Sequence, residues 1–590
     1  MCGIAGIIGS HSAHLLDLFD GALKHRGPDG RGDHVAGNVA MMQRRLAIID
    51  LKGGDQPLYS NNDQKRALIG NGEIYNYIEL RKALDGFPFR TLSRLQVPLA
   101  LYGRDGVSFP HHLRGMYALA IHDLVGRRLI LSRDPFGIKQ LYYAETSGSI
   151  AFASEAQALI AAGIAEPNLR SDKRLELLQL HFTLGAQTIF PAIHRLLPGE
   201  TLIIEDGRII SRKQEPAYGI QPSPELIPLS EALKKLDHVL EETIHIHQRS
   251  DVPYAMFLSG GIDSSAILAM MARLNPQPVT AFTAGFPDTT VTDERPLASA
   301  VAKACKAEII EVPVRSQDFW NHLPEIVAAM DDPVCDYAII PTWLLARSAR
   351  QHGFKVVLSG EGGDEIFAGY GRYRSALRSW PFKKSMRSRG VFDGLGLLHP
   401  HYEQDRNWQR EFRDSEAKFS KRDLTSLQKL QATDCMDWLP HDLLIKLDRC
   451  LMAHGVEGRT PFLDREIASF AFNLPDKLKI NQGMGKWLLR HWLEQHLPIA
   501  QPFSRKRGFT VPVGAWMLEQ GKKLGDAMAR QVAIAEIARV DAVRRLYTEP
   551  RLATDSRLAH AAWGLLFYAL WHRRHIQGLT PEGGILDCLS

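Results

Sequence analysis

The hydrophobic pattern of this chain changes partway along, and that change constrains the fold more than any single motif. Short apolar runs broken by Gly, Asn and Asp fill the first part of the sequence. Asp206-Gly207 between two such runs is a strong hairpin signal. This part is therefore predicted to be rich in strands, at residues 3–8, 46–51, 116–122, 128–132, 202–204 and 208–210.

The second pattern alternates short apolar runs with stretches of helical periodicity. Leu233, Leu236 and Leu240 recur at helical spacing, ahead of the first of these runs. Strands that alternate with helices predict a parallel sheet with right-handed crossovers. The predicted strands are residues 254–258, 279–283, 308–312 and 355–358.

Two domains are expected, because 590 residues are too many for one hydrophobic core. Four prolines between residues 216 and 228 mark a linker. We therefore predict an α+β N-terminal sandwich of antiparallel sheets over 2–210, a linker over 211–229, and an α/β parallel-sheet domain over 230–590 that is mostly helical after 371.

Composition excludes several classes of protein. A net charge of +5, without a long basic tract, does not favour nucleic acid. The longest apolar stretch, 561–571, is too short to cross a bilayer and is expected to form a buried helix. No signal peptide is recognisable. Six cysteines without CxxC spacing argue against a zinc site or a disulfide framework, and are typical of the reducing cytoplasm.

A cysteine directly after the initiator methionine is the first candidate for catalysis. Removal of Met1 would leave Cys2 with a thiol and a free α-amine on one residue. An α-amine has a pKa near 8 in peptides and can act as a general base, while the thiolate attacks carbonyl carbon. Alone, a Met-Cys start is more often a small buried residue at a strand.

The surrounding motifs resemble the class II glutamine amidotransferases, whose N-terminal cysteine hydrolyses glutamine on an N-terminal-nucleophile sandwich. They are His-Arg-Gly-Pro-Asp-Gly from His25, Arg-Leu-Ala-Ile-Ile-Asp from Arg45 and Asn-Gly-Glu-Ile-Tyr-Asn from Asn71. The resemblance implies that Arg45 grips the glutamine carboxylate and that Asn71 and the Gly72 amide stabilise an oxyanion. The implied glutamine-binding residues are Arg45, Leu46, Ala47, Ile48, Ile49, Asn71, Gly72, Glu73 and Arg94.

Arg94 departs from that family's pattern. Related sequences place an aspartate there to hold the glutamine ammonium, whereas this chain reads Ser-Arg-Leu-Gln from Ser93. Like charges about 5 Å apart at an effective dielectric of about 20 repel by about 3 kcal/mol. Two interpretations follow: Arg94 weakens glutamine binding, or it turns to solvent and a nearby acid such as Glu73 or Asp105 takes over.

A glycine-rich turn after the strand at 254–258 is the candidate nucleotide site. It reads Ser-Gly-Gly-Ile-Asp-Ser-Ser from Ser259 and opens a helix, whose N-terminal amides favour an anion. The turn resembles the pyrophosphate loop of ATP pyrophosphatases and lacks the Gly-Lys-Ser/Thr of a Walker A loop. Asp263 would help to hold magnesium.

A second turn, Ser-Gly-Glu-Gly-Gly-Asp-Glu from Ser359, resembles the asparagine synthetase motif. Three carboxylates in five residues at a strand end would repel one another without a cation, which favours a nearby metal or basic group over a solvated acidic loop. The resemblance implies that Glu361 supports adenylate formation, that Asp364 contacts magnesium-pyrophosphate, and that Lys506 balances charge on the departing pyrophosphate. The implied ATP-binding residues are Phe257, Leu258, Ser259, Gly260, Gly261, Asp263, Ser264, Ser265, Ala284, Ser359 and Gly360.

The expected activity is ATP-dependent amidation of a carboxylate with ammonia from glutamine, through an acyl-adenylate. ATP and Mg²⁺ are the expected cofactors, and aspartate is the default acceptor. The alternatives are another carboxylate, such as a sugar uronic acid or a natural-product intermediate, and a non-catalytic protein with relic sites. β-Lactam synthetases and lasso-peptide cyclases share the second domain but typically lack a working Cys2. A homodimer is compatible with the resemblance, and no nucleic acid or membrane partner is expected.

Overall fold

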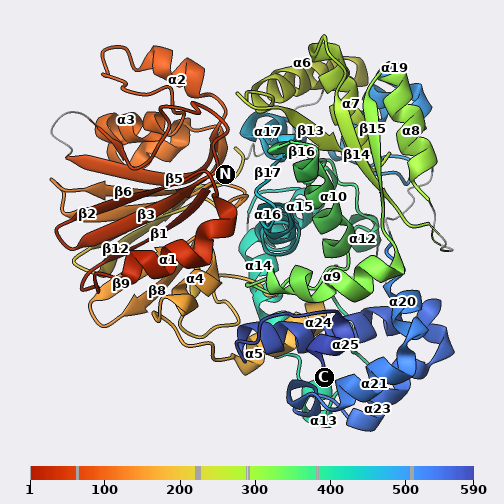
Figure 1. The fold of residues 1–590 in the computed structure, drawn as a ribbon. Helices are drawn as coiled ribbons and strands as arrows, with labels where there is room; N and C mark the ends of the chain where they lie inside the picture. Colours follow the sequence, from red (N-terminus) through yellow and green to blue (C-terminus); the bar gives the residue numbers. More distant parts are fainter. Residues whose placement is uncertain are drawn as a thin grey trace.

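The protein is described from a computed structural model, in which two antiparallel sheets lie beside a larger α/β part (Figure 1). The strands of the first part occupy one side of the molecule, and the helices near the C-terminus lie together at one end of the other side. The structure describes residues 2–60, 65–219, 227–287, 289, 291, 293–379, 382, 385–420, 422–504 and 510–590.

The first part is a sandwich of two six-stranded antiparallel sheets. The first sheet has the order β10 (His194–Arg195), β8 (Tyr142–Thr146), β9 (Ser149–Ala153), β1 (Cys2–Ile8), β3 (Val39–Arg45), β2 (Gly30–Ala36). The second has the order β12 (Arg208–Gln214), β11 (Glu200–Glu205), β7 (Arg128–Arg133), β6 (Gly115–Asp123), β5 (Arg66–Ile74), β4 (Leu58–Tyr59). The predicted sandwich is therefore confirmed, as is the hairpin at Asp206-Gly207 between β11 and β12.

Apolar residues fill the space between the two sheets, and helices cover their outer faces. Ile4 and Ile8 of β1 pack with Ala118 and Ala120 of β6. Helix α1 (Leu15–Leu23) packs on the outer face of the first sheet, where Phe19 is fully buried. Helix α3 (Gln96–Asp105) covers the second sheet, with α2 (Tyr77–Ala83) close by. Because both faces of each sheet are covered, functional side chains are expected at the ends of the strands.

The third sheet is parallel, as the alternating pattern predicts. Its order is β15 (Glu308–Pro313), β14 (Thr280–Gly285), β13 (Tyr254–Phe257), β16 (Val356–Leu358), β17 (Glu457–Arg459). β14 and β15 follow β13 in the chain and lie on one side of it, whereas β16 and β17 lie on its other side. The strand order therefore reverses between β13 and β16, the place where ligands bind in open α/β sheets.

Helices connect and cover the parallel sheet. Helix α24 (Ser556–His575) is buried at every position from Ala561 to Trp571, which confirms the expectation for residues 561–571. No helix within the described ranges is both long and apolar enough to cross a membrane. The principal helices are α5 (Ser171–Leu180), α6 (Leu229–His247), α7 (Ile262–Leu274), α8 (Arg295–Ala304), α9 (Ser316–Ala328), α10 (Ile339–Gln351), α15 (Ser426–Met436), α16 (Leu444–Met452), α17 (Arg465–Phe472), α19 (Trp487–His496) and α24 (Ser556–His575).

Two predictions about strands need correction. Residues 46–51 form no strand, because β3 ends at Arg45. Their apolar side chains Leu46, Ile48 and Ile49 belong instead to the core cluster that contains residues of α6 and α7. The fifth strand, β17, was not predicted, because Glu-Gly-Arg carries no apolar pattern and is buried through its ion pairs.

Candidate functional site

Cys2 opens β1 at the end of the first sheet. It lies opposite Arg45 of β3, and only 3% of the residue is exposed. Its main-chain nitrogen donates to Asn71 Oδ1 at 2.9 Å. That nitrogen becomes the α-amine once Met1 is removed, so the predicted base and the predicted oxyanion residue are in direct contact.

Asn71 and Gly72 lie side by side in β5, facing the start of β1. Asn71 is fully buried, and its Nδ2 makes no hydrogen bond to the described protein. A buried amide donor without a partner is costly and is typical of a group reserved for a ligand. Gly72 has φ +151°, and a Cβ there would lie 2.1 Å from the Met116 carbonyl oxygen. The main chain can follow this path only with glycine, so the two implied oxyanion donors are rigidly placed.

Arg45 anchors the loop that follows β3. Its guanidinium donates to Asp55 Oδ1 at 2.8 Å and to the carbonyl oxygens of Asp50 and Leu51. The loop residues Leu46, Ile48 and Ile49 are buried, whereas the amide of Ala47 donates to Asp29. The implied glutamine-binding loop is thus brought to the same end of the sandwich as Cys2.

Arg94 is neither in solvent nor unpaired. It is 6% exposed, its Nε lies 2.7 Å from Glu73 Oε2, and it also donates to the Gly72 carbonyl oxygen. Arg459 contacts the same Glu73 oxygen at 3.2 Å. Burial raises the pKa of Glu73 to about 7, and the two arginines oppose that shift. The interpretation in which Arg94 turns to solvent is wrong, and Asp105 pairs with Arg104 and His112 instead.

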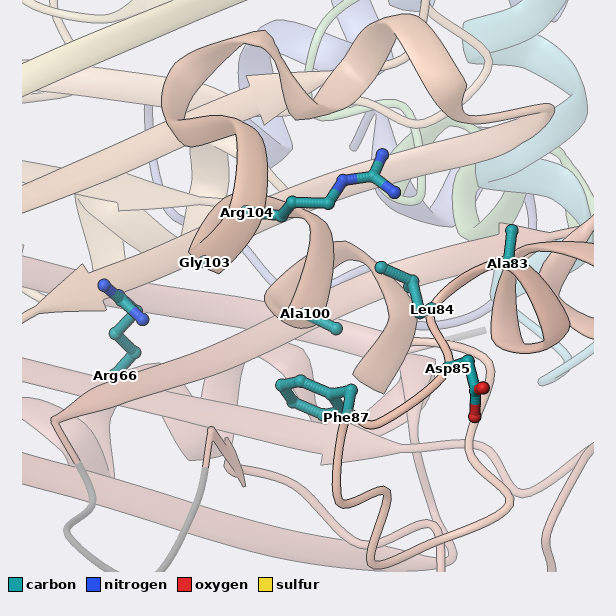
Figure 2. Close-up of a pocket in the computed structure, with 8 residues that line it drawn as sticks. All are labelled: Arg66, Ala83, Leu84, Asp85, Phe87, Ala100, Gly103 and Arg104. Atoms are coloured by element: carbon teal, nitrogen blue, oxygen red, sulfur yellow. The ribbon is translucent and has the colours of Figure 1, made fainter.

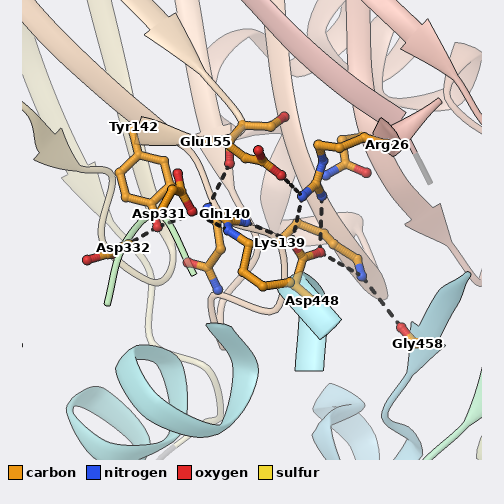
Figure 3. Close-up of polar contacts among 12 residues, drawn as sticks. Arg26, Lys139, Gln140, Tyr142, Glu155, Asp331, Asp332, Asp448 and Gly458 are labelled. Carbon is orange, nitrogen blue, oxygen red and sulfur yellow. Dashed lines mark hydrogen bonds and ion pairs between the residues drawn. The ribbon is translucent and has the colours of Figure 1, made fainter. Parts of the chain in front are cut away.

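Buried ion pairs around Arg26 join the sandwich to the α/β part (Figure 3). Arg26 donates to the Cys2 carbonyl oxygen, to Glu155 at 2.7 Å and to Asp448 at 2.8 Å. Lys139 of the sandwich reaches the Gly458 carbonyl oxygen at 3.5 Å. Breaking one partner of a buried pair typically costs about 3–5 kcal/mol, so this contact holds the two parts in a fixed relation.

The glycine-rich turn from Ser259 links β13 to α7 at the point where the sheet order reverses. Gly260 has φ +71°, which favours glycine, and Gly261 precedes the first residue of the 13-residue helix. Ser265 is fully buried, and its Oγ makes no hydrogen bond to the described protein. Main-chain amides and a spare hydroxyl at a helix start form an anion-binding turn.

The turn from Ser359 follows the neighbouring strand β16 and packs against the first turn. A Cβ at Gly363 would lie 2.5 Å from Asp263 Oδ1, and one at Gly360 would lie 3.0 Å from Asp263 Cβ. Both glycines are therefore required for the close approach. The two turns that the sequence places about a hundred residues apart form one site, as parallel neighbouring strands require.

Lys486 lies between the two turns and was assigned no role from sequence. It bonds to Asp263 and lies 2.8 Å from Asp364 Oδ1, although 223 residues separate it from Asp263. The carboxylates of Asp263 and Asp364 thus both contact the Lys486 ammonium. Lys486 has φ +56° and precedes α19. A single lysine carries no spacing signal that could have identified it from the sequence.

Glu361 lies on the other side of the second turn, toward α16. Burial raises its pKa, and Lys446 opposes the shift, while Asp336, Asp364 and Asp263 add to it. Lys446 itself donates to Asp336 Oδ2 at 2.7 Å. Glu361 therefore connects the second turn with a polar cluster that contains Lys446 and Asp336.

The remaining predicted residues divide into two groups. Lys506 and its motif from Arg505 to Phe509 lie outside the described residues. The other predicted ATP-binding residues line the same strand ends: Phe257, Leu258, Ser264, Ala284 and Ser359.

A hollow on the outer side of the sandwich is separate from these sites (Figure 2). It lies between α2, α3 and β5, with Arg66, Phe87 and Arg104 among its lining residues. None of the sequence-predicted site residues lines it, so we assign it no role in catalysis.

Comparisons with known proteins agree with this arrangement. The family described as asparagine synthase matches residues 235–573, and the glutamine amidotransferase domain matches residues 1–215. An asparagine synthetase [glutamine-hydrolyzing] of Bacillus subtilis is 31% identical, covering 98% of this chain and 97% of that protein. A putative asparagine synthetase [glutamine-hydrolyzing] of Mycobacterium bovis is 34% identical, with 98% and 97% covered. Amidase chyE of Penicillium rubens is 27% identical, with 81% and 83% covered.

The chain belongs to the glutamine-hydrolysing asparagine synthetase family. It is accordingly a ligase of the glutamine-dependent amidotransferase type, with glutamine and ATP as substrates.

Proposed function

We propose that the enzyme converts aspartate to asparagine through an aspartyl-adenylate, with ammonia released from glutamine at Cys2. The observation that carries the proposal is the meeting of two acidic, glycine-rich turns where the parallel sheet reverses its order. The domains would be 2–210 and 230–590, joined by the linker 211–229. We expect the enzyme in the cytoplasm, where its six free thiols would stay reduced, and a homodimer stays a prediction.

The glutamine step would use the contacts around Cys2. The Cys2 thiolate attacks the amide carbon, the Cys2 α-amine having taken the thiol proton. Asn71 Nδ2, which makes no hydrogen bond to the described residues, and the Gly72 amide would stabilise the oxyanion. Ammonia leaves with that proton, and water then hydrolyses the glutamyl thioester to glutamate.

The synthetase step would use the two turns. An acceptor carboxylate oxygen attacks the α-phosphorus of ATP, and the bond to the bridging oxygen breaks to release pyrophosphate. Ammonia attacks the acyl carbon, and AMP leaves. The Ser259–Ser265 turn would bind pyrophosphate, with Lys486 between Asp263 of this turn and Asp364 of the second turn.

Magnesium fits this site, because Asp263 and Asp364 converge on one position of positive charge. These two carboxylates would hold Mg²⁺ with the pyrophosphate oxygens, and the ion would neutralise charge on the leaving group. The carboxylates alone, without a cation, would repel the triphosphate.

The proposal is tested by exchange of labelled pyrophosphate into ATP. Exchange should require a carboxylic acid and should be supported by aspartate. Exchange supported only by a uronic acid would move the assignment to another acceptor. Absence of exchange with every acid, while ATP still binds, would contradict the acyl-adenylate mechanism.

Arg94 should make the enzyme a poor user of glutamine. Its guanidinium holds Glu73 at 2.7 Å, where a carboxylate would otherwise be available to the glutamine ammonium. We expect Arg94→Asp to lower the KM for glutamine by about two orders of magnitude, because repulsion of about 3 kcal/mol between like charges is replaced by attraction. The measurement is glutaminase activity without ATP.

Arg94→Lys is the matched control for that experiment, because it keeps the charge and should leave the KM high. An unchanged or higher KM in Arg94→Asp would show that Arg94 serves only to hold Glu73 in place.

A further inference from the structure

A π-helical turn, Leu439–Leu443, lies between α15 and α16 and carries unusual polar groups. Single π turns are rare and often occur at functional sites. Five buried atoms on or just before it make no hydrogen bond to the described protein: Asp437 Oδ2, Trp438 Nε1, His441 Nδ1 and Nε2, and Asp442 Oδ1. Each such atom costs about 1–3 kcal/mol, so their concentration in one turn calls for a ligand.

Arg387 brings a positive charge to the same turn from another segment. Its side chain is 8% exposed and packs on the rings of Trp438, Phe182 and Phe412 at 4.7–5.2 Å. Its Nη2 lies 3.3 Å from Asp434 Oδ1, whereas Nη1 makes no hydrogen bond to the described protein. One edge of a fixed, planar guanidinium therefore stays available, and that edge suits a carboxylate.

This cluster adjoins Glu361 through Lys446. Lys446 follows Asp442 by one helical turn and donates to Asp336. Asp442 is 2% exposed, and burial raises its pKa; Asp336 and Glu361 add to that shift, whereas Lys446 and Arg387 oppose it. Glu361, Arg387, Asp442 and Lys446 thus form one polar group, which we call the acceptor cluster.

We propose that the acceptor cluster recognises an amino acid by both of its charged groups. The ammonium binds Asp442 Oδ1, one carboxylate binds Arg387 Nη1, and the reacting carboxylate is directed toward Glu361 and Lys446. This rests on the proposed function, and it names the residues that select the acceptor. The ammonium of a zwitterion suits the acceptor atom Asp442 Oδ1, and its carboxylate suits the donor atom Arg387 Nη1. A uronic acid supplies no cation, so Asp442 Oδ1 would gain no hydrogen-bond donor from it and would stay without a partner.

The test uses two analogues of aspartate, each lacking one recognition group. Succinate lacks the ammonium, and β-alanine lacks the α-carboxylate. Acceptor-dependent pyrophosphate release by the full-length enzyme gives kcat/KM for each acid. The natural enzyme should favour aspartate over both analogues by about thirtyfold or more, the usual cost of an unpaired buried charge. If another amino acid is the better acceptor, its own two analogues replace these.

Two variants should separate the two contacts. Asp442→Asn should reduce the preference for aspartate over succinate and leave the preference over β-alanine, whereas Arg387→Gln should do the reverse. The exposed neighbours Asp423→Asn and Arg422→Gln are the matched controls and should change neither ratio. The KM for ATP should stay the same in all four.

Several outcomes would overturn the inference. If each variant lost kcat/KM equally with aspartate, succinate and β-alanine, Asp442 and Arg387 would only support the structure and would not contact the acceptor. Equal or better use of succinate or D-glucuronate by the natural enzyme would exclude amino-acid recognition while leaving ATP-dependent adenylation intact, and this comparison needs no variant. Release with none of the acids would instead contradict the proposed function itself, and the inference with it.

Discussion

Cys2→Ala should abolish glutamine-dependent amidation and spare synthesis from added ammonia. The loss should be about four orders of magnitude or more, as for other nucleophiles that act as a unit with their base. The physical reason is that Cys2 begins a strand of the sandwich, whereas the two glycine-rich turns, from Ser259 and Ser359, follow strands of the parallel sheet. Glutamate release and amide formation are measured in parallel with each nitrogen source.

Cys305→Ala is a suitable control, because that thiol is half-buried on the α/β side. A tag that blocks removal of Met1 should have the same effect as Cys2→Ala, because it blocks the α-amine. Glutamine hydrolysis at the normal rate in Cys2→Ala would show that the nucleophile is another group.

Glu361→Ala should lower adenylate formation with either nitrogen source while glutamine hydrolysis continues. Glu361 is half-buried, and the charges of Lys446 and Asp364 both act on it; in the proposed mechanism it lies where the acceptor carboxylate would meet the α-phosphate. Removing a charged group that acts on transition-state charge commonly costs about 3 kcal/mol, which is about two orders of magnitude in rate. Pyrophosphate release with saturating aspartate is the measurement.

The isosteric Glu361→Gln separates charge from volume and should show a loss of similar size. Glu325→Gln, at an exposed position of α9, should have no effect. Unchanged pyrophosphate release in both Glu361 variants would remove Glu361 from the reaction. We expect Lys506→Ala to lower adenylate formation in the same way; Lys506 lies outside the described residues.

Most of the strand and helix pattern could be predicted from local signals. The strand at 3–8, the Asp-Gly hairpin and the helix after Gly261 depend on side-chain alternation and turn chemistry, which the sequence displays directly. Residues 46–51 have the same apolar character but form a loop, because Leu46, Ile48 and Ile49 are buried against the α/β part. Periodicity indicates that a segment is buried without indicating what covers it.

The partners of the charged residues could not be predicted in this way. Sequence suggested that Arg94 would either face the glutamine ammonium or turn to solvent, and the structure pairs it with Glu73 beside Arg459. Lys486 had no assigned role, yet it joins the acids of two distant turns. Long-range ion pairs have no spacing rule along the chain, because they depend on how the sheet edges meet.

By itself, the sequence determined the class of both parts and the identity of the turns at Cys2, Ser259 and Ser359, because a strand, a glycine-dependent turn and a helix start are encoded within a few residues. Only the tertiary structure decided that the two nucleotide turns form one site around Lys486 and that Glu73 is shared by two arginines. It also decided that Arg387 packs on Trp438 and that Lys446 pairs with Asp336. These relations arise where separate strands and helices converge, and no local pattern specifies the distance between side chains that lie far apart in the sequence.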